Sequence, residues 1–183
     1  MKKIVLIPTY NEKENVSAIL HAVLGLSLDY HVLIIDDNSP DGTAAIVEGL
    51  MGKFLDRLFI LKRPGKQGLG TAYIQGFKWA LENNYDYIFE MDADFSHNPN
   101  DLDRLLAACE EKGADVSIGS RYVKGGETEN WPLDRKIYSL GGSAYTRIIT
   151  GMPIKDPTAG FICYNNKVLA DINLDTIQFI GYA

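Results

Sequence analysis

Five short apolar runs alternate with segments of helical periodicity, and this alternation restricts the possible folds more than any other feature of the chain. The runs lie at residues 4–8, 31–35, 57–62, 87–91 and 115–120, and the helical segments at 15–24, 43–54, 71–83, 101–112 and 135–150. A strand buried on both faces is typically a continuous apolar run, and a helix returns the chain to the start of the next parallel strand. The sequence therefore predicts an α/β fold with a mainly parallel sheet and helices on both faces.

Size and charge narrow the possibilities further. The chain has 183 residues, of which 46% are hydrophobic, and this is enough for one ordinary core; we expect a single domain over residues 1–183. The formal net charge of −6 argues against nucleic acid as a partner, because nucleic-acid binding needs a basic surface. No segment approaches the roughly 18 apolar residues of a membrane span, and Cys109 and Cys163 are expected as free thiols. The end in QFIGYA, without a closing helix, suggests a C-terminal truncation.

The carboxyl ends of the expected strands carry most of the polar residues that could bind a ligand. In open sheets of this kind, ligands bind beyond these ends, where the connecting loops converge. The segments found there are PTYNE, DDNSPDG, RPGKQGLG, DADFS and SRY. Four of the five contain acidic residues or a glycine-rich turn, which a purely structural sheet does not require.

The DADFS segment places Asp92 and Asp94 two positions apart where an apolar strand meets the surface. Side chains at this spacing on a strand point to the same side, so the two carboxylates would repel each other unless a cation lies between them. The hard oxygen ligands favour Mg²⁺ or Mn²⁺, whose sites usually take one or two carboxylates and leave the rest of the shell to substrate phosphates. The structural alternative is a turn at Asp94 and a helix cap at residues 98–101, which explains the cap but not the paired carboxylates.

The remaining segments leave several readings open. In DDNSPDG, the SPDG part is a turn signal before a helix starting at Thr43, and Asp36 or Asp37 is left as a candidate ligand for a base or ribose. The Gly-rich segment at 63–70 matches neither a phosphate-binding Walker loop nor a dinucleotide fingerprint, so we read it as a flexible loop over the site. His97 is either a ligand or a turn residue. Arg135 and Ser139 share a helix face that could bind an anion or simply face solvent.

Taken together, seven segments resemble the catalytic domain of the polyprenol-phosphate (dolichol-phosphate) mannosyltransferases, which are inverting family 2 glycosyltransferases. The segments are IPTYNE, VLIIDDNSPDGT, RPGKQGLGTAYIQGF, MDADFSHNP, IGSRYVKGG, NWPLDRKIYSLGG and DPTAGF. The resemblance is collinear from about Lys3 to the end of the chain. It implies the GT-A fold of nucleotide-diphospho-sugar transferases.

The resemblance also implies roles for individual residues. Asp94 and Arg121 would be catalytic, and a Mg²⁺ or Mn²⁺ ion would be held by Asp92, Asp94 and Ser96. Ser96 stands where relatives often have Gln, so water is expected between its hydroxyl and the metal. Acceptor phosphate would contact Arg121, Arg135 and Ser139, and the segment beginning at Asp156 lines the acceptor side in relatives. The nucleotide would be surrounded by Pro8, Tyr10, Glu12, Ile35, Asp37, Asp92 and Ala93.

The expected reaction is metal-dependent inverting transfer of a sugar, with mannose and GDP-mannose as the expected donor, to a polyprenyl or dolichyl phosphate. We expect a cytoplasmic protein that contacts the cytoplasmic face of a membrane peripherally. Three alternatives stay open. The first is a family 2 transferase that acts on a sugar hydroxyl and therefore needs a carboxylate base. The second is a non-catalytic nucleotide-sugar sensor. The third is a phosphatase with Asp92 as nucleophile.

Overall fold

A six-stranded sheet in the order β3-β2-β1-β4-β6-β5 organises the structure, a computed structural model that describes residues 1–123 and 133–177. Of residues 133–140 only the helical backbone is described. The strands are β1 (Lys3–Thr9), β2 (His31–Asp36), β3 (Leu58–Lys62), β4 (Tyr87–Glu90), β5 (Val116–Ile118) and β6 (Ile162–Asn165). Strands β1 to β4 pair in parallel, whereas β6 runs antiparallel to both β4 and β5.

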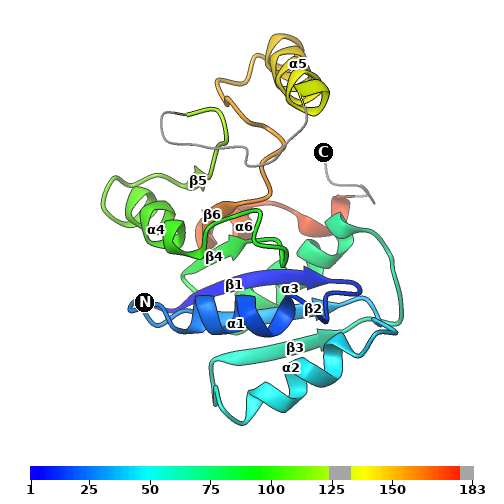
Figure 1. Ribbon diagram of the computed structural model, residues 1–183. Coiled ribbons are helices and arrows are strands. Elements are labelled where there is room, and N and C mark those ends of the chain that lie inside the picture. Colours follow the sequence, from blue (N-terminus) through cyan, green and yellow to red (C-terminus); the bar gives the residue numbers. More distant parts are fainter. Residues whose placement is uncertain (124–132, 178–183) are drawn as a thin grey trace.

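Helices cover both faces of this sheet. They are α1 (Val16–Leu24), α2 (Thr43–Met51), α3 (Leu69–Glu82), α4 (Leu102–Glu110), α5 (Leu133–Thr150) and α6 (Asn166–Asp171), with short 3₁₀ turns at Pro99–Asp101 and Leu174–Thr176. Helices α1 and α2 lie on one face of the central strands and α3 on the other, whereas α5 stands apart from the sheet (Figure 1). The predicted α/β architecture is therefore confirmed.

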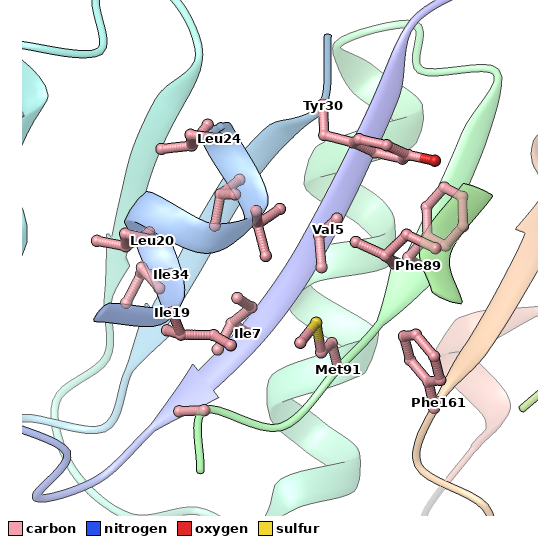
Figure 2. Packing of buried hydrophobic residues seen from close by; sticks show 14 of the residues in the cluster. Val5, Ile7, Ile19, Leu20, Leu24, Tyr30, Ile34, Phe89, Met91 and Phe161 are labelled. Carbon is pink, nitrogen blue, oxygen red and sulfur yellow. The ribbon is translucent and has the colours of Figure 1, made fainter. Parts of the chain in front are cut away.

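The alternation of side chains along β1 divides the core into two layers. Val5 and Ile7 point toward α1 and pack with Phe89 and Met91 of the neighbouring strand and its extension (Figure 2). Their neighbours on the strand point to the opposite face, where they pack against α3. Helix α3 comes close to the sheet at Gly76, where a Cβ atom would lie only 2.6 Å from a methyl group of Ile35. Both faces of β1 are therefore shielded from solvent, which explains its continuous apolar sequence.

The strand directions bring five loops and the segment before β6 to one edge of the sheet. Since β1 to β4 are parallel, the loops that follow them lie together at their carboxyl ends. Because β6 is antiparallel to β4, the segment that precedes β6 lies at this same edge, as does the segment that follows β5. Residues 156–161 therefore join the five loops that the sequence analysis singled out, the last of which contains residues 120–122.

The five predicted strand–helix units are all present in the predicted order, with shifts of a few residues at their ends. Helix α3 begins at Leu69 rather than at Thr71, directly after Gly68, whose φ of 97° is a backbone conformation that suits glycine. The turn before α2 ends at Gly42, with φ of 94°, and the helix starts at Thr43 as expected. Strand β6 and helix α6 were not predicted, because ICYN is short and follows a loop without a helical segment before it.

Candidate active site

The loops after β1 and β2 are tied together by hydrogen bonds from main-chain N–H groups. Asn11 N–H donates to Ser39 Oγ at 3.1 Å, and Glu12 N–H donates to Thr43 Oγ1 at 3.0 Å. Asp36 is almost fully buried and accepts from the Thr9 hydroxyl and from Ser39. The structure thus assigns Asp36 to the turn, and of the two adjacent acidic residues it leaves Asp37 as the ligand candidate.

Asp37 is held by Arg63, a residue that the sequence analysis did not single out. Arg63 Nη1 lies 2.8 Å from Asp37 Oδ1, and both side chains are nearly inaccessible to solvent. The same guanidinium donates to Gln67 and Thr71, so it connects the end of β2 to the loop before α3. Burial raises the pKa of Asp37, and the charge of Arg63 opposes this shift. The signal for Arg63 was its position directly after a strand, before the Pro-Gly pair.

The predicted nucleotide-binding residues divide into exposed and buried ones. Tyr10 is 40% exposed, and the Lys66 ammonium lies 4.8 Å from its ring centroid, so the Gly-rich loop lies next to Tyr10. Pro8 and Glu12 are half-buried. The side chains of Ile35 and Ala93 belong to the two core layers, so only their backbone groups can meet a ligand.

Asp92 and Asp94 follow β4, which ends at Glu90, and lie in an irregular segment rather than on the strand. Alternation nevertheless continues past the strand end, because Met91 and Ala93 remain in the core. Burial, the neighbouring Asp94 charge and the Glu12 charge raise the pKa of Asp92 to about 6. The Asp94 charge therefore acts with burial against ionisation of Asp92, in the direction that the spacing predicted.

Asp94 has the opposite electrostatic environment. Burial alone would raise its pKa, but hydrogen bonds from the hydroxyl and the N–H of Ser96 hold the pKa below its usual range. The N–H of Ser96 lies 2.9 Å from Asp94 Oδ1. Between them, Phe95 takes a left-handed backbone conformation with φ of 59°, which is unusual for a bulky residue. Ser96 thus supports the ionised form of Asp94.

The carboxylates of this segment fit a divalent cation with an open coordination shell. Within the described part of the chain, no group of three or more His, Cys, Asp or Glu side chains is arranged to hold a metal by itself. A pair of repelling carboxylates is instead the donor set of an ion that shares its remaining positions with water and phosphate oxygens, as Mg²⁺ and Mn²⁺ do.

Arg121 faces this segment from the loop after β5. Its Nε and Nη2 atoms donate to the two oxygens of Asp156 at 2.8 and 2.7 Å, and its own N–H donates to the same carboxylate. The Asp156 side chain is fully buried, and the Arg121 side chain is 22% exposed. Burial would raise the pKa of Asp156, but the Arg121 donors hold it below its usual range. The charge of Arg121 also lowers the pKa of Asp92, against the larger effect of burial.

The other two predicted phosphate-binding residues, Arg135 and Ser139, occupy positions on α5, but their side chains lie outside the described residues. The second half of α5 exposes Tyr145, Ile148 and Ile149, which are between 67% and 80% exposed. No helix in the described ranges, residues 1–123 and 133–177, is long and apolar enough to cross a membrane.

Residues 4–172 match the family described as glycosyl transferase family 2. The chain belongs to this family. This family 2 domain is 44% identical over 181 residues to a polyprenol monophosphomannose synthase of Mycolicibacterium smegmatis, covering 99% of the chain and 68% of the relative. It is 44% identical over 182 residues to an undecaprenyl-phosphate mannosyltransferase of Micrococcus luteus, covering 100% of the chain and 74% of the relative.

A dolichol-phosphate mannosyltransferase of Pyrococcus furiosus is 40% identical over 187 residues, and the family 2 domain spans half of its length. Solved structures share the fold of the domain. A Pyrobaculum calidifontis mannosyltransferase, in complex with GDP-Man and Mn²⁺, aligns with a TM-score of 0.64 at 16% identity, over 94% of the domain and 46% of that chain. A Mycobacterium tuberculosis glucosyl-3-phosphoglycerate synthase, in complex with Mn²⁺ and UDP-glucose, aligns with a TM-score of 0.64 at 14% identity. This alignment covers 93% of the domain and 59% of that chain.

The raised pKa of Asp92 predicts how the metal-free glycosyltransferase domain responds to pH. An unfolded Asp titrates near 3.9, so between about pH 4 and 6 the folded state retains a proton that the unfolded state has lost. The ionised Asp92 therefore destabilises the fold progressively as the pH rises through this window. We expect Asp92→Asn, in EDTA, to raise the melting temperature by about 3 °C at pH 7.5, with the gain vanishing near pH 4. The side chain is 41% exposed, and solvent screening keeps the effect this small.

Thermal unfolding followed by circular dichroism across this pH range measures the effect. Asp94→Asn is the matched control, because the ionised form of Asp94 is stabilised by Ser96 and its neutralisation should lower the melting temperature. A gain for Asp92→Asn that grows toward acid pH would contradict the electrostatic account.

The Arg121–Asp156 pair predicts a large loss of stability when its buried partner is neutralised. We expect Asp156→Asn to lower the free energy of unfolding by about 3 kcal/mol, the lower end for a buried pair, because Arg121 retains some solvent contact. Asp29→Asn is the control, since the Arg57–Asp29 pair is exposed, and it should cost at most about 0.5 kcal/mol. Urea unfolding provides both values, and equal effects would show that Asp156 has no special role.

Proposed function

We propose that this domain transfers mannose from GDP-mannose to the phosphate of a polyprenyl phosphate, with inversion at the sugar C1 and with Mg²⁺ or Mn²⁺ as cofactor. The 44% identity over almost the whole chain to a polyprenol monophosphomannose synthase carries this proposal. The location of the repelling Asp92 and Asp94 near Arg121 supports it, because the reaction joins two anionic substrates at one point.

The donor side of the site would be built from the first four loops. The nucleoside would lie between Tyr10 and Asp37, with Glu12 and the backbone at Ile35 and Ala93 around it. Asp92 and Asp94 would hold the cation together with the donor diphosphate, and Ser96 would orient Asp94 or contact the ion through water. A cation held there would supply the positive charge that offsets the negative charge on the leaving diphosphate.

The acceptor side would be built from Arg121, Arg135 and Ser139. Arg121 would align the phosphate of the lipid, and its orientation is fixed by Asp156. A phosphate oxygen attacks C1 of mannose from the side opposite the leaving group, the bond from C1 to the diphosphate breaks, and its electron pair leaves with GDP. A phosphate monoester, with a second pKa near 6, is already anionic at neutral pH, so this step needs no strong general base.

The lipid substrate implies that the protein works at a membrane, and we propose peripheral contact at the cytoplasmic face. Three exposed apolar side chains on α5, Tyr145, Ile148 and Ile149, follow the positions of Arg135 and Ser139 on the same helix. Apolar groups of this kind on one face of a helix suit the boundary between lipid head groups and acyl chains.

An assay with GDP-mannose, Mn²⁺ and polyprenyl phosphate tests the proposal. We expect release of GDP and formation of mannosyl phosphoryl polyprenol, and no product when polyprenol without phosphate is supplied. Transfer to a sugar hydroxyl in place of the lipid phosphate would support the other family 2 reaction. Binding of Mn²⁺ and GDP-mannose with no turnover would support a sensor.

The double variant Arg121→Gln with Asp156→Asn sharpens this test, because it removes both charges and leaves neither buried alone. We expect its kcat/KM for polyprenyl phosphate to fall about 100-fold, as is typical when a charge-stabilising donor is lost. GDP binding should be unchanged and serves as the control for folding. Unchanged kcat/KM for the lipid would overturn the role given to Arg121.

A further inference from the structure

His97 is a largely buried polar side chain beside the predicted metal ligands, and the reaction as described has no use for it. It follows the Asp92–Ser96 segment, and only 13% of its side chain is exposed. Its ring lies flat against the ring of Phe161, with 5.0 Å between centroids and 10° between planes. Phe161 is itself fixed, because it is buried just before β6 on the same face of the sheet as Met91 (Figure 2). The plane of the imidazole is therefore set by the core.

This orientation aims one ring nitrogen at the metal-binding segment. His97 Nε2 lies 3.5 Å from Asp92 Oδ2, slightly beyond hydrogen-bonding distance. The nitrogen is buried, and among the residues that the structure describes it has no hydrogen-bond partner. Buried polar atoms without a hydrogen-bond partner are costly and rare. We therefore expect an acceptor to come within hydrogen-bonding distance of His97 Nε2.

The backbone of Gly160 limits the space from which an acceptor can reach His97 Nε2. A Cβ atom at Gly160 would lie 3.4 Å from Asp92 Oδ2 and 3.8 Å from His97 Nε2, so the backbone of residue 160 borders both groups. With Phe161 against the ring and Gly160 beside the pair, the Asp92 carboxylate is the acceptor already next to Nε2. The 3.5 Å separation exceeds the usual upper limit of about 3.2 Å by only a few tenths of an ångström.

We propose that His97 is a positioning residue that donates its Nε2–H to Oδ2 of Asp92 and thereby turns the other carboxylate oxygen toward the divalent cation. The inference rests on the proposed function, since it gives a role to a residue behind the proposed metal ligand. Hydrogen-bond partners of this kind orient ligating carboxylates, and their loss typically weakens metal binding by about 10–100-fold.

Three variants separate this role from simple packing. His97→Phe keeps a ring to stack on Phe161 and removes the donor, whereas His97→Gln removes the ring and keeps an N–H donor. His21→Phe is the matched control, because His21 is exposed on α1 and contacts Phe54 rather than the site. Thermal unfolding without metal should show His97→Phe to be as stable as the unmodified protein to within a few degrees.

The deciding measurement is the Mn²⁺ affinity of the GDP-saturated protein, obtained by titration calorimetry. We expect His97→Phe to bind Mn²⁺ about 10–100-fold more weakly, His97→Gln to recover part of the loss, and His21→Phe to match the unmodified protein. Pulsed electron paramagnetic resonance of the bound Mn²⁺ should show no directly coordinated nitrogen.

Different failures have different meanings. If His97→Phe binds Mn²⁺ normally, or if a nitrogen is coordinated directly to the metal, the positioning role is overturned and the proposed metal site stands. If the unmodified protein with GDP binds no Mn²⁺ at all, the metal part of the proposed function fails, and the role of His97 fails with it.

Discussion

The electrostatic conflict between Asp92 and Asp94 is the constraint around which the rest of the site is arranged. The two carboxylates lie in a segment whose alternate residues, Met91 and Ala93, are buried in the core, so the core anchors the backbone on both sides of Asp92. The pKa of Asp92 is raised to about 6, while Ser96 keeps Asp94 ionised. A cation that binds between Asp92 and Asp94 in the folded protein would therefore stabilise the fold.

The antiparallel strand β6 explains how one short segment supports both halves of the site. Because β6 inserts between β4 and β5, the residues before it arrive at the carboxyl ends of the parallel strands. There Asp156 fixes the Arg121 guanidinium, and Phe161 fixes the His97 ring beside Asp92. Arg121 and His97 are therefore both held by residues of a single loop, and their relative placement depends on how β6 pairs.

The sequence was sufficient to predict the strand–helix units and the paired carboxylates, because both are local patterns. Apolar runs and helical periodicity report burial directly, and a two-residue spacing fixes which side chains share a face. The roles of Arg63, Asp156 and Phe161 could not be predicted, since each depends on contacts between segments far apart in sequence. Arg121 and Asp156, for example, are partners only because β6 pairs with β5 in the observed antiparallel register.

The most direct test of the account is the donor affinity of Asp94→Asn, measured by calorimetric titration of GDP with and without Mn²⁺. In the unmodified protein, Mn²⁺ should tighten GDP binding at least about tenfold, because the ion joins the diphosphate to the carboxylate pair. In Asp94→Asn this dependence on Mn²⁺ should be largely lost, while the weak metal-free affinity persists. If the variant retained both the affinity and the requirement for Mn²⁺, the paired carboxylates would not be the metal site.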